Sequence, residues 1–254
     1  MPAPINRFKR ALTSGKPQFG CWLSLADAGA AEIVGSTGFD WVLIDGEHAP
    51  NDIRSIRNQL SALQASDSAA IVRVPIGETW LIKQVLDVGA QTVMVPMVES
   101  AEQARDLVRA CTYPPTGTRG VGAAAARATR FGAIGDYVAT ADEQICLLVQ
   151  VESRAGIAAL DDILAVDGVD GVFIGPADLS TDMGFKGDMD TPEVQDTIRD
   201  ALQRIAAAGK APGILTLGDK TPAYLEAGAQ FLAVAIDVVL LVNGARETVA
   251  KWQG

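Results

Sequence analysis

The stretch Asp170-Gly171-Val172-Phe173-Ile174-Gly175-Pro176-Ala177-Asp178-Leu179-Ser180 joins a short apolar run to a Gly-Pro pair and a carboxylate. The apolar run predicts a buried strand. Pro176 predicts the first turn of a helix, because proline has no N–H group to leave unpaired. Asp178 then lies beside the free N–H groups of a helix start, an arrangement that suits a small acidic ligand held through a metal ion. The alternative is that Asp178 only caps the helix.

Similar apolar, β-branched runs recur along the chain at a fairly regular spacing. We predict strands at Phe19–Leu23, Trp41–Ile44, Ala70–Val74, Thr92–Val95, Cys146–Val151, Gly171–Ile174, Ala211–Leu215 and Phe231–Val234. These runs are nearly continuous in apolar residues rather than alternating. That pattern is typical of parallel strands that are covered on both faces.

Between the strands, apolar residues recur three or four positions apart, which indicates helices. We predict them at Ala26–Ser36, Asp52–Gln64, Thr79–Val88, Ala101–Cys111, Arg154–Leu164, Glu193–Ala208, Asp219–Ala227 and Val238–Lys251, with a short extra helix at Asn6–Leu12. Eight strand–helix units in 254 residues predict an α/β chain that forms one (β/α)8 TIM-barrel domain over residues 1–254. An open doubly wound sheet is the second choice.

The composition excludes several classes of function. Hydrophobic residues make up 48% of the chain and charged residues 20%, which is an ordinary globular balance. The net charge of −10 argues against binding to nucleic acid or to an anionic membrane. The scattered Cys21, Cys111 and Cys146 predict neither a disulfide framework nor a zinc finger. We find no signal peptide and no membrane-spanning run, and we expect a cytoplasmic protein.

Polar residues at the carboxyl ends of the strands are the candidates for an active site, because that is where barrels carry one. Glu152 and Asp178 follow consecutive strands and are expected to converge. Two close carboxylates repel each other unless a proton or a cation is shared between them. With water and an oxygen-rich ligand, Mg²⁺ or Mn²⁺ is the natural occupant. The alternative is a pair of helix caps or salt bridges.

Asp45-Gly46-Glu47-His48 follows the second predicted strand and contains the only histidine of the chain. We predict that His48 is a general base, because the two carboxylates in this run can orient the ring and tune its pKa. Asp45 and Glu47 would then hold the imidazole or a metal-bound water. A purely structural histidine is the alternative.

Arg73 lies on an otherwise apolar strand, where a guanidinium needs an anionic partner. Its planar fork suits a substrate carboxylate or a developing enolate oxygen. A buried ion pair with Asp45 or Glu152 is the alternative. Gln150 is expected to be a neutral hydrogen-bond partner of the substrate. No lysine stands at the carboxyl end of a predicted strand, which disfavours a Schiff-base aldolase.

Several of these stretches resemble the HpcH/HpaI family of class II, metal-dependent pyruvate aldolases, such as 4-hydroxy-2-oxoheptanedioate aldolase and 2-keto-3-deoxy-sugar-acid aldolases. The resemblance is carried by Trp41–Asn51, Tyr113-Pro114-Pro115 with Arg119–Gly122, Val149–Glu152 and Gly171–Ser180. The second of these lies in the long irregular stretch from Thr112 to Arg130, and a loop of that length is usually functional.

The resemblance implies that Glu152 and Asp178 ligate a divalent cation, Mg²⁺, Mn²⁺ or Co²⁺, which pyruvate or another 2-oxo acid chelates. It implies a binding site for pyruvate in which the N–H groups around Ala177 and Asp178 hold the carboxylate. The residues of this site are Gln150, Gly175, Pro176, Ala177 and Asp178. It also implies that Arg73 stabilises the enolate and contacts the aldehyde carbonyl.

In the same family, His48 would serve proton transfer at the 4-hydroxyl group, and Asp87 would pair with the histidine of a neighbouring subunit. The family is typically hexameric, a trimer of dimers that exchange their last helix. Leu215 and Leu217 follow the seventh strand, where the family contacts the aldehyde, and they suggest an apolar wall there.

These implications predict a carbon–carbon lyase that reversibly cleaves a 4-hydroxy-2-oxo acid to pyruvate and an aldehyde through a metal-stabilised enolate. A related metal-dependent lyase, acting on an acyl-CoA or decarboxylating oxaloacetate, is one alternative. A non-catalytic barrel that binds a keto acid is another. In each case the partners are small molecules and further copies of the chain.

Overall fold

The computed structural model describes residues 1–253 and contains a closed barrel of parallel strands in chain order. Each strand pairs with its neighbours in sequence, and β8 pairs with β1. The (β/α)8 prediction is therefore confirmed, and the open sheet is excluded. The strands are β1 (Gln18–Leu23), β2 (Trp41–Asp45), β3 (Ala69–Arg73), β4 (Thr92–Val95), β5 (Cys146–Val151), β6 (Gly171–Ile174), β7 (Ala211–Leu215) and β8 (Phe231–Ile236).

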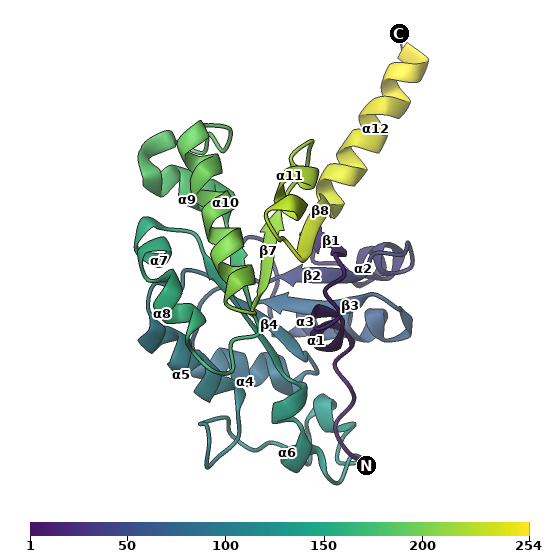
Figure 1. Ribbon diagram of the computed structural model, residues 1–254. Coiled ribbons are helices and arrows are strands. Elements are labelled where there is room, and N and C mark those ends of the chain that lie inside the picture. Colours follow the sequence, from purple (N-terminus) through teal and green to yellow (C-terminus); the bar gives the residue numbers. More distant parts are fainter. Residues whose placement is uncertain (254) are drawn as a thin grey trace.

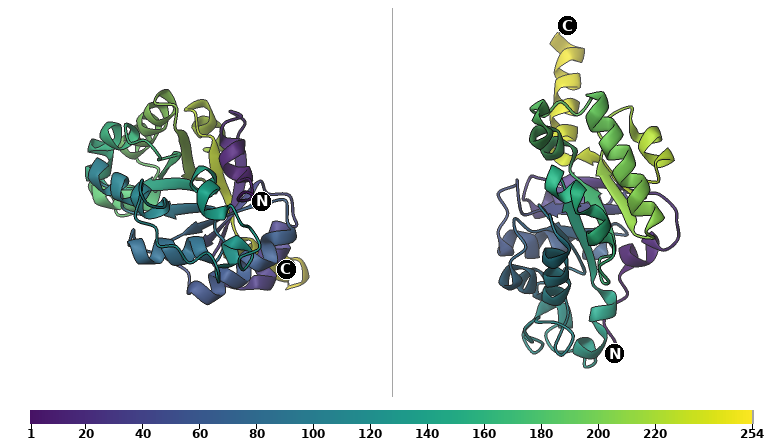
Figure 2. Two further views of the ribbon diagram at one scale, coloured as in Figure 1. Left: turned by 90° about the horizontal axis from the view of Figure 1, so that it is seen from below. Right: turned by 60° about the vertical axis from the view of Figure 1, so that its left-hand side comes forward.

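Most of the helices surround the strands on the outside of the barrel, whereas α12 projects away from it (Figures 1 and 2). The helices are α1 (Arg7–Leu12), α2 (Ala28–Gly35), α3 (Ile53–Ala62), α4 (Thr79–Asp87), α5 (Ala101–Cys111), α6 (Tyr137–Thr140), α7 (Arg154–Ala158), α8 (Leu160–Leu164), α9 (Pro176–Ser180), α10 (Pro192–Ala207), α11 (Thr221–Glu226) and α12 (Asp237–Gln253). Shorter helical turns are η1 (Leu63–Ala65), η2 (Arg127–Thr129), η3 (Asp142–Gln144) and η4 (Thr181–Phe185).

The prediction of one helix over Arg154–Leu164 was wrong, because two short helices, α7 and α8, occupy that stretch. Ala159 separates them with φ −88° and ψ 1°, outside the α-helical range. Gly156 brings α7 close to the loop after β4, since a Cβ there would lie 3.0 Å from the carbonyl oxygen of Val98. The break therefore accompanies close packing of α7 on a loop near the carboxyl end of the barrel.

An aromatic cluster fills the interior of the barrel near the amino-terminal ends of the strands. The ring centroids of Trp41 and Phe231 lie 6.1 Å apart. The ring of Phe8, from α1, packs against them with its centroid 5.7 Å from that of Phe231. Gly20 leaves room for the indole, because a Cβ there would lie 2.1 Å from the Trp41 ring. A second apolar layer lies between the strands and the outer helices. The barrel is thus a packed core that α1 closes at its amino-terminal end.

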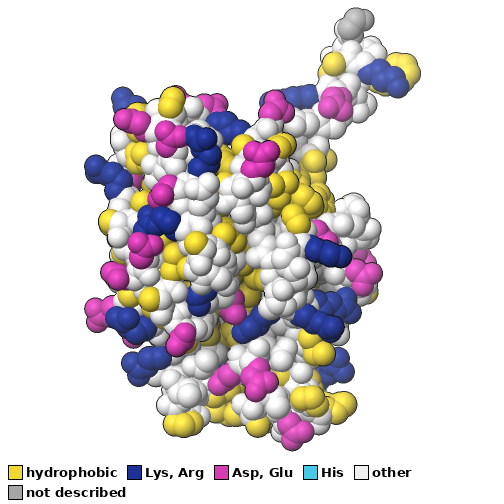
Figure 3. Space-filling view, in the orientation of Figure 1, with side chains coloured by type: hydrophobic (Ala, Val, Ile, Leu, Met, Phe, Trp, Pro, Cys, Tyr) yellow, Lys and Arg dark blue, Asp and Glu magenta, His cyan; other side chains and the backbone are white. Residues whose placement is uncertain are grey.

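Helix α12 leaves the barrel after β8 and projects from the body, with hydrophobic side chains gathered at its base (Figures 1 and 3). Asp237 anchors this base, since its buried carboxylate accepts the N–H groups of Ser24 and Leu25 at 2.9 and 3.1 Å. Farther out, Leu241 and Trp252 are 62% and 78% exposed. Within residues 1–253, no helix is both long and apolar enough to cross a membrane.

Candidate active site

The uppermost inward-facing layer of the barrel is polar. Asp45 and Arg73 are the last residues of β2 and β3 and pair in register, and Gln150 is the penultimate residue of β5. All three are buried, with 1%, 6% and 3% of their surface exposed. Buried polar and charged groups of this kind need partners or a ligand. The chemistry of the chain therefore collects at the carboxyl end of the barrel, as its fold predicts.

Two carboxylates and an indole hold the guanidinium of Arg73. Its Nε and Nη2 atoms donate to the two carboxylate oxygens of Asp45 at 2.9 and 2.8 Å. Nη1 lies 2.7 Å from Glu47 Oε2. The ring of Trp22 lies 4.8 Å from Arg73 Cζ, and its Nε1 donates to Asp45 Oδ2 at 3.2 Å. The ion pair with Asp45 is thus present, and it fixes the plane of the guanidinium.

The two carboxylates around Arg73 differ in their affinity for a proton. Burial by itself would raise the pKa of Asp45, but the hydrogen bonds and charge of Arg73 outweigh it and lower that pKa. Burial raises the pKa of Glu47. The positive charge of Arg73 lowers this pKa, but the negative charges of Asp45 and Asp178 raise it, and the net shift is upward. Asp45 is therefore the firm counter-ion of the guanidinium, and Glu47 is the carboxylate that accepts a proton more readily.

Glu152 comes directly after β5 and is almost fully buried, with 3% exposed. The backbone N–H of Met97 donates to its Oε1 at 2.9 Å, and the side-chain amide of Gln150 donates to its Oε2. Burial raises the pKa of Glu152, and the negative charges of Asp178 and Glu47 raise it further. A buried carboxylate of this kind binds a proton or a cation more readily than an exposed one.

Gly175 lets β6 pass directly beside Glu152. A Cβ at Gly175 would lie 2.3 Å from Glu152 Oε2 and 3.0 Å from Gln150 Nε2, so any side chain there would displace the carboxylate. Helix α9 follows with Pro176 at its start, and Gly175 as the residue before it offers no capping side chain. In the part of the chain that the structure describes, α9 has no side-chain capping bond, so the interpretation of Asp178 as a cap was wrong. Among residues 1–253, the N–H groups of Ala177 and Asp178 have no acceptor.

His48 and two leucines lie at the rim of this cluster. The imidazole is 68% exposed, and its Nε2 lies 3.9 Å from Glu47 Oε2. The backbone N–H of Glu47 donates to Asp45 Oδ1 at 3.0 Å, which shapes the loop that carries the histidine. Asp45 therefore contacts the guanidinium rather than the imidazole. Leu215, at the end of β7, is partly buried, and Leu217 is exposed.

Asp87 lies apart from the cluster within one chain. It ends α4, which runs back toward the amino-terminal end of the barrel. Its carboxylate accepts a hydrogen bond at 3.2 Å from Nη2 of Arg119, a fully buried residue. The Arg119 guanidinium packs 4.5 Å from the ring of Tyr113 and 5.8 Å from that of Tyr137. The long irregular stretch therefore braces the carboxylate of Asp87.

Sequence reasoning missed two residues that shape the site. Trp22 carried a usable signal, because it lies two positions after Gly20 on β1 and therefore on the same inward face. Met97 carried none, because it acts through its backbone N–H and a left-handed conformation with φ 55°. Such a backbone conformation is uncommon for a residue other than glycine, asparagine or aspartate.

The donor set fits a hard divalent cation. Within residues 1–253, no group of three or more His, Cys, Asp or Glu side chains could by itself hold a metal ion. Mg²⁺ and similar ions commonly bind through one or two carboxylates and fill their other positions with water and substrate oxygens. Glu152 and Asp178 supply such a pair. The buried Oε1 of Gln150 has no partner among the described residues, which leaves it free for a ligand.

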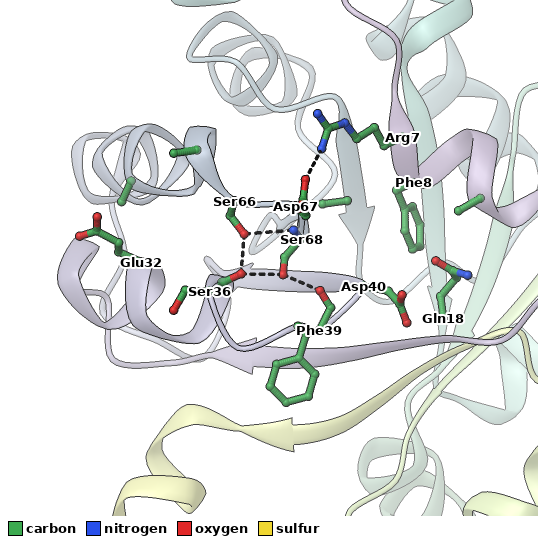
Figure 4. A pocket seen from close by; sticks show the side chains of 16 residues that line it. Arg7, Phe8, Gln18, Glu32, Ser36, Phe39, Asp40, Ser66, Asp67 and Ser68 are labelled. Carbon is green, nitrogen blue, oxygen red and sulfur yellow. Dashed lines mark hydrogen bonds and ion pairs between the residues drawn. The ribbon is translucent and has the colours of Figure 1, made fainter.

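A cavity of about 590 Å³ lies at the opposite end of the barrel (Figure 4). The hydroxyls of Ser66 and Ser68 both donate to the carbonyl oxygen of Gly35, at 2.5 and 3.0 Å, and Arg7 pairs with Asp67 at 3.2 Å. These polar groups already bond to the protein, so they do not converge on a ligand. The amino-terminal end of such a barrel usually serves stability rather than catalysis.

The fold and this cluster define a (β/α)8-barrel protein with a carboxylate-rich site at the carboxyl ends of its strands. The HpcH/HpaI aldolase/citrate lyase family matches residues 18–244, and the chain belongs to that family.

Relatives of known name match nearly the whole chain. It is 62% identical over 254 residues to the hydroxypyruvate/pyruvate aldolase of Roseovarius nubinhibens, with 100% of this chain and 99% of the relative covered. It is 52% identical over 248 residues to the 4-hydroxy-2-oxo-heptane-1,7-dioate aldolase of Salmonella arizonae, with 97% and 94% covered. An HpcH/HpaI aldolase/citrate lyase family protein from Burkholderia cenocepacia J2315 superposes with a TM-score of 0.93 at 40% identity, covering 98% of this chain and 100% of the other.

Proposed function

We propose that this protein is a class II pyruvate aldolase, which reversibly cleaves a 4-hydroxy-2-oxo acid to a 2-oxo acid and an aldehyde. The observation that carries the proposal is the close approach of Gly175, three residues before Asp178, to the buried carboxylate of Glu152, at the end of the barrel that also holds the fixed guanidinium of Arg73. Relatives named as aldolases of pyruvate and of 4-hydroxy-2-oxo acids support it at 62% and 52% identity.

Glu152 and Asp178 would hold the divalent cation. When bound, this ion supplies the Lewis-acid polarisation of the 2-keto group of the substrate. The free N–H groups of Ala177 and Asp178, at the start of α9, are suited to the substrate carboxylate. Gly175 keeps this seat open by leaving no side chain beside Glu152.

Arg73 stabilises negative charge as it develops on the enolate oxygen and orients the carbonyl of the aldehyde. Its fork is already fixed by Asp45, so little reorganisation accompanies the reaction. His48, at the rim, takes up the proton of the 4-hydroxyl group during cleavage, directly or through water. The more proton-accepting carboxylate of Glu47 lies between His48 and Arg73, where it can share that proton.

The 2-oxo acid released on cleavage is pyruvate or hydroxypyruvate in this proposal, following the names of the more similar relatives. The aldehyde side is bounded by Leu215 and the exposed Leu217, which favour an acceptor without a charged terminus. We test this by mixing the enzyme and Mn²⁺ with each 2-oxo acid and a panel of uncharged and carboxylated aldehydes. We expect 4-hydroxy-2-oxo acid products by mass spectrometry, mainly from the uncharged acceptors. Failure to condense with any acceptor would contradict the aldolase proposal.

In the proposed oligomer, a trimer of dimers, α12 packs on a second copy of the chain. Support comes from the apolar side chains that α12 exposes along its length, among them Leu240, Leu241 and Trp252. Asp87 would approach His48 of a neighbouring subunit, which agrees with its position outside the cluster of its own chain. We expect light scattering to give a hexamer for the full chain and a smaller species after removal of residues 238–254. A full-length monomer would contradict this assembly.

A further inference from the structure

The carboxylate of Glu152 is oriented by two different donors. Gln150, on the same strand, contacts Oε2, whereas the backbone N–H of Met97 donates to Oε1 at 2.9 Å. The second donor comes from the loop between β4 and α5, so the orientation of Glu152 depends on a neighbouring strand. Partners of this kind, which orient a ligand without touching the metal, control metal affinity in proteins.

Met97 presents its N–H group from an unfavourable backbone conformation. Its φ is 55°, in the left-handed region where a long side chain is disfavoured and glycine is the usual occupant. Its side chain is 48% exposed, so burial of the side chain does not explain the conformation. Another contact must therefore hold the turn in place.

The side-chain amide of Gln103 supplies that contact. Its Nε2 donates to the carbonyl oxygen of Met97 at 3.1 Å, and its Oε1 accepts the N–H of Glu99 at 3.0 Å. One amide group thus spans the turn from both sides. Gln103 is itself placed by Ser100, the cap of α5, whose hydroxyl accepts the Gln103 backbone N–H at 3.1 Å.

The same loop is tied at two further points, one in β5 and one at the residue before α7. The N–H of Val98 donates to the carbonyl oxygen of Gln150 at 3.0 Å, and the hydroxyl of Ser153 donates to Glu99 Oε1 at 2.5 Å. Their partners Gln150 and Ser153 lie on either side of Glu152 in the chain. The loop therefore remains attached when Gln103 is changed, whereas the turn from Met97 to Glu99 loses the two bonds that this amide makes.

We infer that Gln103 is a positioning residue for the metal site, acting on Glu152 through the N–H group of Met97. The inference rests on the proposed function, in which Glu152 is a ligand of the divalent cation. Neither Gln103 nor Met97 contacts the substrate seat in this scheme. Their effect is on the orientation of one carboxylate and hence on the affinity for the ion.

The test is a titration with Mn²⁺, followed by the electron paramagnetic resonance signal of the free ion. We expect Gln103→Ala to raise the Kd for Mn²⁺ by roughly tenfold, the lower range for loss of a supporting partner. Gln84→Ala is the matched control, because Gln84 is an exposed helical glutamine with no side-chain hydrogen bond recorded within residues 1–253. The urea midpoint of the metal-free protein is measured in parallel.

A second variant separates local positioning from general destabilisation. Glycine adopts the left-handed region readily, so Met97→Gly combined with Gln103→Ala should recover part of the lost Mn²⁺ affinity. Wild-type affinity in Gln103→Ala would overturn the inference, as would a double variant that binds no better than Gln103→Ala. If Glu152→Gln also binds Mn²⁺ like the wild type, the proposed metal site itself is contradicted. If Glu152→Gln loses Mn²⁺ binding while Gln103→Ala binds like the wild type, the proposed metal site stands and only the role of Gln103 is rejected.

Discussion

Arg73 and Asp45 end neighbouring strands and lie side by side at the mouth of the barrel, joined by two hydrogen bonds of 2.9 and 2.8 Å. This fork leaves the third nitrogen, Nη1, against Glu47 at 2.7 Å. The guanidinium is therefore held in one plane before any substrate arrives. A preorganised cation of this kind is what stabilisation of a developing oxyanion requires.

Arg73→Lys is expected to lower kcat/KM for retro-aldol cleavage by roughly 100-fold, the order seen when one donor to an oxyanion is lost. A lysine can pair with one carboxylate oxygen but cannot reproduce the planar fork. Steady-state kinetics check this, with urea unfolding as the control for folding. Unchanged kinetics in a folded variant would reject the role of the fork.

Asp45→Asn is expected to destabilise the protein by about 3 kcal/mol near neutral pH, because it weakens the pairing of a buried guanidinium. The pKa of Asp45 is lowered in the fold, so its stabilisation is present above the unfolded pKa of about 3.9. That stabilisation disappears as the pH falls through the folded pKa. The difference between wild type and variant should therefore shrink in acid, as measured by urea midpoints. A difference that is constant with pH would contradict the assignment.

Gly175→Ala is expected to lower activity by roughly 100-fold, since small displacements of reacting groups have effects of that order. The new Cβ would lie 2.3 Å from Glu152 Oε2 and would push the carboxylate away. Gly218→Ala is the matched control, because a Cβ at Gly218, after β7, would meet no atom within 4 Å. Equal activity of the two variants would reject a close approach at Gly175.

The three cysteines are expected to resist modification in the folded protein. Burial raises the pKa of Cys21 and of Cys111 to about 12, and that of Cys146 well above its usual range. Protonated, buried thiols stabilise the fold at neutral pH, and this contribution is lost only as the pH rises toward those values. An aromatic disulfide reagent should label the thiols rapidly in urea and hardly at all without it. Fast labelling of the native protein would contradict the burial.

The barrel could be predicted because its strands are continuously apolar and the helices between them keep a clear period. Gly171–Ile174 illustrates this, since the observed β6 has the predicted bounds. The prediction that Glu152 and Asp178 lie near each other followed from topology alone, because consecutive parallel strands place their carboxyl ends side by side. Their roles as metal ligands stay predictions.

Other features depend on three-dimensional contacts that no local pattern encodes. Sequence reasoning left open whether Arg73 would face Asp45, Glu152 or a substrate, because all three positions share one end of the barrel. The left-handed conformation of Met97 occurs where Gln103, six residues later, donates to its carbonyl oxygen. The break at Ala159 was missed because the apolar period continues through it from α7 into α8.

The most direct test of the aldolase assignment is deuterium exchange into pyruvate in D₂O, without an aldehyde, followed by mass spectrometry. Enolate formation through the site of Glu152 and Asp178 predicts that the wild type with Mn²⁺ incorporates deuterium at the methyl group. Addition of EDTA, or the substitution Glu152→Gln, should abolish this exchange. Exchange at the wild-type rate in EDTA-treated Glu152→Gln would contradict the metal-dependent enolate, and a wild type that never exchanges would point to a keto-acid-binding barrel instead.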